Sequence, residues 1–205
     1  MNNLAKPVIF LLCLWPGAYL IYAVYLAFTG GENLLGTDPA QFLSLQTGEW
    51  AIRLLILSLA ITPLRYLFNW PYAFQFRRMI GLFAYFYVCM HLLVFLWFLL
   101  GWQWGNIGVE IAERPFITIG FSAFVLLTPL AATSFNAAQR KLGRNWKKLH
   151  RLTYAVSILA VMHVIWIVRS SYFDAVLYGG LVFLMLGYRF LRKYSGAVKG
   201  FSLIR

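Results

Sequence analysis

The sequence predicts an all-α fold: a polytopic membrane bundle of six transmembrane helices. Hydrophobic residues make up 61% of the 205 residues and charged residues 12%, whereas soluble domains are about half apolar and about a quarter charged. Apolar runs recur six times, each near the ~20 residues that a helix needs to cross a bilayer. Basic residues gather in alternate gaps between these runs, as in the loops of membrane proteins.

The predicted spans follow one another without a long hydrophilic insert, so we expect a single transmembrane domain over residues 1–205. The first span exceeds the roughly 7–15 apolar residues of a signal peptide, which predicts that it is retained. We see no internal sequence repeat. The predicted spans are Val8–Phe28, Trp50–Phe68, Met79–Leu100, Phe116–Phe135, Leu152–Val168 and Ala175–Leu191.

Charge in the gaps predicts the orientation of the bundle. Of the 18 basic residues, only Arg53, Arg114 and Arg169 fall on one side, and all the acidic residues accompany them. The positive-inside rule makes the other side cytoplasmic and places both termini there. The net charge of +12 is therefore explained by cytoplasmic loops that face membrane lipid. We expect membrane lipid and no nucleic acid as a partner.

The longest basic gap, residues 133–151, is partly amphipathic. Asn136 is a candidate N-cap for a short helix that lies on the cytoplasmic surface. Two interpretations stay open: a solvated loop that only sets topology, and a docking surface for a soluble electron donor.

Three histidines are the candidate functional residues, because the chain has no intact hydrolase, kinase or nucleotide-binding motif. His91 in the third span and His163 in the fifth lie roughly 18 and 20 Å from the cytoplasmic side, at 1.5 Å per residue. Ionisable side chains at such depth are costly and mark functional sites. Two imidazoles at one level can ligate a haem iron from opposite faces; the alternative is a pair of hydrogen-bonded structural histidines.

Other functional classes find less support in the residues. No acidic residue is predicted inside a span, which argues against a proton-coupled transporter. The histidine and carboxylate spacings of zinc and di-iron sites do not occur on the spans. His150 lies at the interface, about 20 Å from His163, too far to share one iron with it.

Five stretches occur in an order that resembles a known family. They are LGTDP at 35–39, ITPL at 61–64, RRMIGLFAYFYVCMHL at 77–92, ERPFITIG at 113–120 and QRKLGRNWKKLHRLTY at 139–154. They resemble the MsrQ (YedZ) family, the haem-binding membrane subunits of periplasmic methionine sulfoxide reductase systems. This family belongs to the ferric-reductase-like transmembrane group.

The resemblance implies a multi-pass subunit of the bacterial inner membrane that carries haem b and no catalytic residue for the sulfoxide. It implies electrons from the quinone pool or a cytosolic flavin reductase, with FMN and quinone as further candidate cofactors. The acceptor is a periplasmic molybdopterin-containing methionine sulfoxide reductase. A cofactor-free membrane transporter or assembly factor is the alternative.

The resemblance also implies a ligand set. Members of the group carry two histidines, thirteen or fourteen residues apart, in each of two spans, and these hold two stacked haems. His150 and His163 fit this pattern, but the third span has only His91, with Arg77 and Arg78 where its partner falls. One haem on His91 and His163 is implied, and we expect His150 to belong either to a second haem or to a flavin site, the alternative being a solvated interfacial histidine.

Four arginines are candidate partners of anionic groups. We expect Arg53 or Arg169 to pair with a propionate of the outer haem, the alternative being that both only flank spans. Arg77 and Arg78 join cytoplasmic cations that suit haem propionates, a flavin phosphate or lipid headgroups.

Overall fold

The computed structural model of the chain describes residues 4–167 and 172–202, which form helices and connecting turns without a strand. Within this part of the chain, six helical segments are long and apolar enough to cross a membrane, which confirms the predicted number. They are Ala5–Thr29, Pro39–Leu67, Pro71–Leu99, Pro115–Ala132, Arg144–Ile167 and Phe173–Tyr194.

The spans comprise several elements. The first two are α1 (Ala5–Thr29) and α2 (Pro39–Leu67); the third joins the 3₁₀ turn η1 (Pro71–Phe76), α3 (Arg77–Val94) and the π-helical turn η2 (Phe95–Leu99). The remaining elements are η3 (Trp104–Asn106), α4 (Ile107–Glu113), α5 (Pro115–Ala132), α6 (Asn136–Leu142), α7 (Arg144–Leu149), α8 (Leu152–Ile167) and α9 (Phe173–Ser202).

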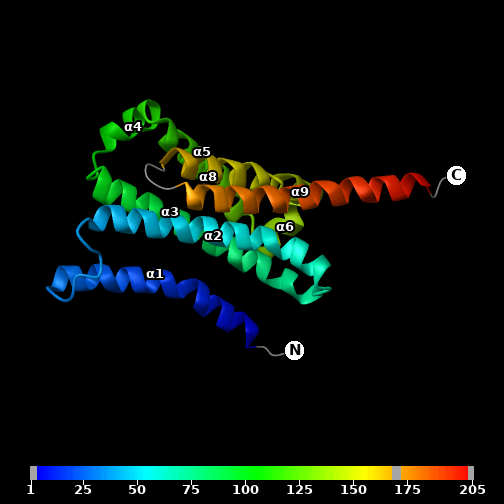
Figure 1. Ribbon diagram of the computed structural model, residues 1–205, viewed down its shortest axis with the longest axis horizontal. Helices are drawn as coiled ribbons and strands as arrows, with labels where there is room; N and C mark the ends of the chain where they lie inside the picture. Colours follow the sequence, from blue (N-terminus) through cyan, green and yellow to red (C-terminus); the bar gives the residue numbers. More distant parts are fainter. Residues whose placement is uncertain (1–3, 168–171, 203–205) are drawn as a thin grey trace.

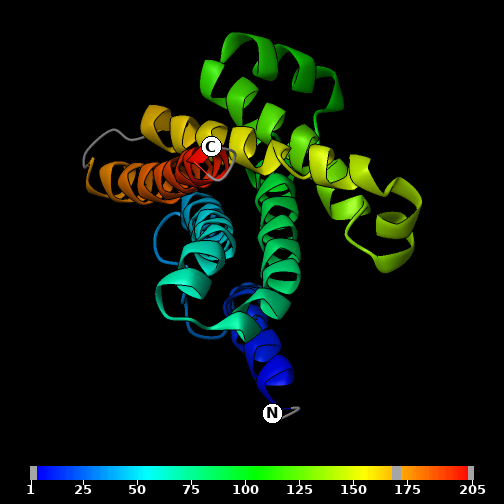
Figure 2. The same ribbon diagram turned by 90° about the vertical axis from the view of Figure 1, so that its right-hand side faces the viewer.

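In Figure 1 the long helices run roughly along the long axis of the molecule, and Figure 2 shows that α3 and α8 are tilted relative to each other. Helix α2 packs mainly on α3, α5 packs on α8, and α9 contacts both α2 and α8. Helix α1 lies at the edge of the bundle, against α3 and α2 (Figure 2). We call the end with residues 68–76 and 133–151 the basic end, and the end with residues 30–38 and 100–114 the acidic end.

Helix α2 begins eleven residues before the predicted Trp50, because residues 38 and 39 form a strong helix start. The Asp38 side chain accepts a hydrogen bond from the Gln41 amide at 2.9 Å, and Pro39 occupies the first turn, where its missing N–H costs nothing. Consequently Arg53 lies well inside α2 and not at its start.

Helix α1 contains a proline, and a tyrosine side chain of α3 inserts beside it. Pro16 lies inside α1, and the fully buried Tyr87 inserts its hydroxyl next to it. This hydroxyl accepts from the Gly17 amide at 2.8 Å and donates to the Cys13 carbonyl at 2.8 Å. The side chain thus replaces a helical hydrogen bond and ties α1 to α3.

A second proline, Pro63, lies inside α2 and supplies no N–H to the carbonyl of Leu59. The Arg189 guanidinium of α9 donates to that carbonyl at 2.7 Å and to the Thr62 hydroxyl at 3.0 Å. It also donates to the Tyr154 hydroxyl at 3.1 Å. Arg189 therefore joins α9, α2 and α8 at the basic end.

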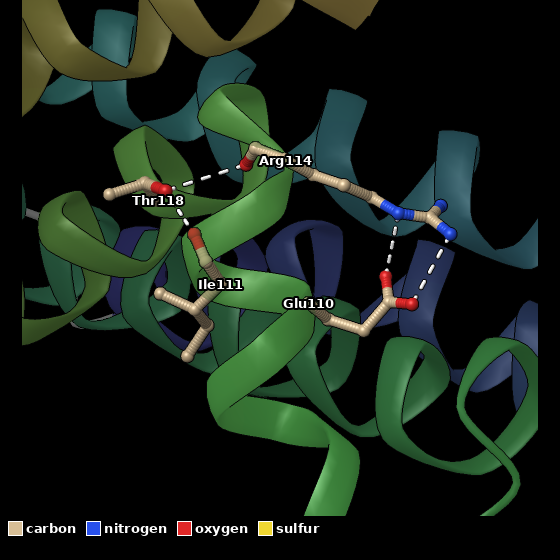
Figure 3. A network of polar contacts seen from close by, with 4 residues as sticks. All are labelled: Glu110, Ile111, Arg114 and Thr118. Carbon is tan, nitrogen blue, oxygen red and sulfur yellow. Dashed lines mark hydrogen bonds and ion pairs between the residues drawn. The ribbon is translucent and has the colours of Figure 1, made fainter.

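At the acidic end, polar contacts fix the corner between α4 and α5 (Figure 3). Arg114 pairs with Glu110 at 2.7 Å, and the Thr118 hydroxyl donates to the Ile111 carbonyl. Because Thr118 lies in the first turn of α5, these contacts define where α5 starts. The backbone carbonyl of Phe116, at this start of α5, belongs to the candidate functional site described below.

The predicted short helix after residue 135 is present as α6, but the predicted cap is wrong. Phe135 occupies the N-cap position, and no side chain caps the helix. The Asn136 side-chain oxygen instead accepts from Arg78 at 2.5 Å. The side-chain oxygen that would cap the helix is therefore hydrogen-bonded to Arg78 of α3.

Candidate functional site

The two histidines expected at one depth lie side by side. The imidazoles of His91 in α3 and His163 in α8 have ring centroids 6.2 Å apart and planes at 86°. Each ring is partly buried between helices. The helix pairs α2–α3 and α5–α8 therefore each contribute one imidazole to a shared site.

His91 is held through one edge of its ring. Its Nδ1 lies 2.9 Å from the Ser44 carbonyl oxygen and 3.3 Å from the Thr47 hydroxyl. Since a carbonyl can only accept, Nδ1 carries the proton, and Nε2 keeps its lone pair. The Thr47 hydroxyl donates to the Leu43 carbonyl at 2.7 Å, which leaves its oxygen to accept from His91.

His163 is held in the same way by α5. Its Nδ1 lies 2.7 Å from the Phe116 carbonyl oxygen, at the helix start that the α4–α5 corner defines. Nδ1 is again the donor, and Nε2 keeps its lone pair. Among the described residues, Nε2 of neither histidine makes a hydrogen bond. Such anchoring of one ring nitrogen is what orients a metal-ligating imidazole.

A glycine lies under each imidazole. A methyl group at Gly120 would lie 2.7 Å from both Cε1 and Nδ1 of His163. A methyl group at Gly48 would lie 3.3 Å from the same two atoms of His91. Any side chain at Gly120 displaces the ring, so the observed placement of His163 requires glycine there, whereas a methyl group at Gly48 would move His91 only slightly.

These contacts repeat along the chain. Ser44 and Phe116 each precede their histidine by 47 residues, and Gly48 and Gly120 each precede it by 43. Sequence inspection missed both glycines, because glycine within an apolar span has no polar signature. The signal available was this equal Gly-to-His spacing in two helix pairs.

His150 lies apart from this pair. It follows α7 at the basic end, stacks on Trp146 with ring centroids 3.9 Å apart, and has Nε2 3.3 Å from the Thr133 hydroxyl. That hydroxyl donates to the Pro129 carbonyl at 2.6 Å, so it accepts from His150. Nε2 of His150 is therefore engaged, unlike the same atom in His91 and His163.

The predicted arginines have separate surroundings. Arg77 lies near enough to His150 and Arg189 for their charges to interact, whereas Arg78 contacts Asn136. Arg53 pairs with Glu49 at 2.5 Å and donates to the Tyr178 hydroxyl at 3.0 Å. Arg169 lies outside the described residues.

The donor set limits which metal the site can hold. Within the part of the chain that the structure describes, no three histidine, cysteine, aspartate or glutamate side chains gather at one point. A zinc site takes three or four protein ligands, but this site offers two imidazoles. Two nitrogen ligands suit a metal whose other positions are already filled, as in a porphyrin.

Comparisons with known proteins identify the family. Residues 47–161 match the model of the ferric reductase like transmembrane component. A "protein-methionine-sulfoxide reductase heme-binding subunit MsrQ" from Polaromonas naphthalenivorans is 45% identical over 200 residues, covering 96% of this chain and 89% of its own. The chain belongs to the MsrQ family.

Other members of the MsrQ family give the same result. The subunit of that name from Xanthomonas campestris pv. campestris is 43% identical, over 93% of this chain and 88% of its own. The subunit from Xanthomonas euvesicatoria pv. vesicatoria is 42% identical with the same coverage. No solved structure matches the chain. The family match includes His91 and His150 and ends two residues before His163.

Proposed function

We propose that this protein is a haem b electron-transfer subunit of the membrane, with His91 and His163 as the axial ligands of its haem. The observation that carries the proposal is the pair of facing-helix imidazoles, each anchored through Nδ1 and each with Nε2 left for a metal. When bound, haem supplies one-electron redox chemistry. The protein contributes the ligands, their orientation and an apolar surrounding.

The residues present fit a haem. The ring centroids of His91 and His163 lie 6.2 Å apart, a separation that would leave room for one metal atom between the two imidazoles. The glycines beneath the rings allow each imidazole to sit close to a helix backbone. The shortage of further protein ligands supports haem over a single ion such as zinc.

The topology supports a direction for the electrons. We place the basic end and both termini on the cytoplasmic side of a bacterial inner membrane, from the positive-inside rule. The paired histidines then lie nearer the periplasmic side. In our proposal, electrons enter from the quinone pool or a cytosolic flavin reductase and leave to a periplasmic molybdopterin-containing methionine sulfoxide reductase. The names of the relatives support the methionine sulfoxide reductase, and the other features follow from the family resemblance.

His150 and Arg77 form the second part of the proposal. They lie at the basic end, close enough for their charges to interact, and suit the side where a donor delivers electrons. The engaged Nε2 of His150 favours a role beside a bound flavin or donor over axial ligation of a second haem. In our proposal a haem propionate pairs with Arg53, which lies inside α2, or with Arg169.

The first experiment asks whether the purified protein contains haem. Protein from haem-replete cells should show a Soret band that shifts on reduction with dithionite. A folded, colourless preparation would instead support a cofactor-free transporter or assembly factor, and the proposal would be wrong.

The second experiment separates the donor side from the haem. In reconstituted vesicles, His150→Ala should slow reduction of the haem by quinol or by a flavin reductase while the haem content stays at the wild-type value. If His150→Ala is reduced as fast as the wild type by both donors, His150 is only an interfacial residue.

A further inference from the structure

A hollow of about 330 Å³ opens at the basic end, between α3, the end of α5 and the start of α6. It contains none of the three histidines, and the nearest link to His150 is Thr133, which precedes the lining residue Ser134 and contacts His150. The residues that line it are Arg78, Leu82, Ala131, Ser134, Phe135 and Asn136.

The polar part of the hollow offers hydrogen-bond donors. Arg78 uses one guanidinium nitrogen on the side-chain oxygen of Asn136 at 2.5 Å, which occupies the amide's acceptor and leaves its NH₂ group and the other guanidinium N–H groups for a ligand. The Ser134 hydroxyl donates to the Leu130 carbonyl. A cation and an amide NH₂ together select a ligand that is negative and rich in acceptor oxygens.

No carboxylate lines the hollow to neutralise Arg78. All six acidic residues of the chain belong to the acidic half of the bundle or to the loops there. Further cations lie outside the lining, on α6 and α7 at the same end of the bundle: Arg140, Lys141 and Arg144. The local field therefore attracts anions from outside the protein.

The apolar part of the hollow distinguishes a lipid from a free anion. Leu82 and Phe135 expose 39% and 59% of their surface, beside the guanidinium. A soluble phosphate gains nothing from such walls, whereas the glycerol and first methylenes of a lipid cover them. Arg78 also lies near the start of a membrane span, at the level of lipid headgroups.

We propose that this hollow binds the headgroup of an anionic phospholipid, with Arg78 and Asn136 donating to its phosphate. Leu82 and Phe135 contact the glycerol and acyl chains. Basic recesses between transmembrane helices are suited to such headgroups. The bound lipid bridges α3 and α6, and so steadies the segment whose Thr133 contacts His150 and whose carbonyl accepts from Trp146. This proposal does not depend on haem.

The test is lipid binding to the full-length protein in detergent, followed by native mass spectrometry. Phosphatidylglycerol should bind at one site with roughly tenfold preference over phosphatidylcholine, because the choline cation offsets the charge of its phosphate and is repelled by the cations of the basic end. Arg78→Gln should remove most of this preference. Asn136→Asp, which supplies Arg78 with an internal carboxylate, should remove it as well. The matched control is Arg140→Gln, which removes a cation outside the lining and should lower the preference far less than Arg78→Gln does.

Three results would overturn the proposal. The first is equal binding of the two lipids to the wild-type protein. The second is a preference for phosphatidylglycerol that survives both Arg78→Gln and Asn136→Asp. The third is a loss of preference in Arg140→Gln as large as that in Arg78→Gln. Phe135→Ser separates the sources of phosphate: it should weaken phosphatidylglycerol binding. If it does not, and millimolar inorganic phosphate displaces the lipid, the hollow is a free-anion site and the lipid assignment is wrong.

Discussion

Gly120→Ala tests the packing of the candidate haem site with a single methyl group. The added Cβ would lie 2.7 Å from Cε1 and Nδ1 of His163 and 3.2 Å from Nε2. Contacts under 3.0 Å cannot persist, so the imidazole must move away from α5. That movement weakens the 2.7 Å bond to the Phe116 carbonyl and shifts Nε2 from the position in which it would hold the haem iron.

The expected magnitude follows from overpacking. Forcing a methyl group into a filled site costs about 1–3 kcal/mol, which corresponds to a roughly 5- to 150-fold loss of haem affinity at about 1.4 kcal/mol per tenfold. Gly48→Ala should have a smaller effect, because its methyl group meets His91 at 3.3 Å. Gly81→Ala is the control: nothing lies within 4 Å of its added Cβ, and alanine favours a helix over glycine.

The assay is haem titration of the apoprotein, followed through the Soret band, with thermal unfolding as a check on folding. We expect the wild type and Gly81→Ala to bind haem most tightly, Gly48→Ala less tightly and Gly120→Ala least tightly. A Gly120→Ala protein that binds haem as tightly as Gly81→Ala would refute the idea that His163 is placed by its contact with this glycine.

Three further predictions concern side chains that position the helices and the site. Thr47→Val removes the hydroxyl beside Nδ1 of His91 and should lower haem affinity by about 1 kcal/mol, roughly fivefold; equal titration curves would contradict this. Tyr87→Phe unpairs two backbone groups of α1 and should cost about 1–3 kcal/mol of stability, seen as a lower Tm with haem affinity retained. Arg189→Leu leaves the Leu59 carbonyl unpaired and should also lower the Tm; a Tm equal to that of the wild type would show that this contact is dispensable.

The number of spans and the pairing of His91 with His163 could be predicted from the sequence. Both depend on the rise per residue and on hydrophobic length, which the chain shows directly. The start of α2 was misplaced, because the polar residues between Asp38 and Trp50 conceal a helix that the Asp38–Pro39 start specifies.

The local chemistry around the histidines could not be predicted. The carbonyls of Ser44 and Phe116 are backbone groups that any residue supplies, so no residue type marks them. Asn136 fits an N-cap by its type, but Arg78, distant in sequence, takes its oxygen. Contacts of this kind depend on tertiary packing, which local pattern does not contain.

The central claim, that His91 and His163 are the axial ligands of one haem, is tested most directly by the absorption spectra of three histidine variants. His91→Ala and His163→Ala should each lose most of the Soret absorbance per folded protein, and added imidazole should restore it by filling the vacated position. His150→Ala should keep the wild-type spectrum. If His91→Ala and His163→Ala both retain the wild-type Soret band without imidazole, the iron has other ligands and the site assignment is wrong.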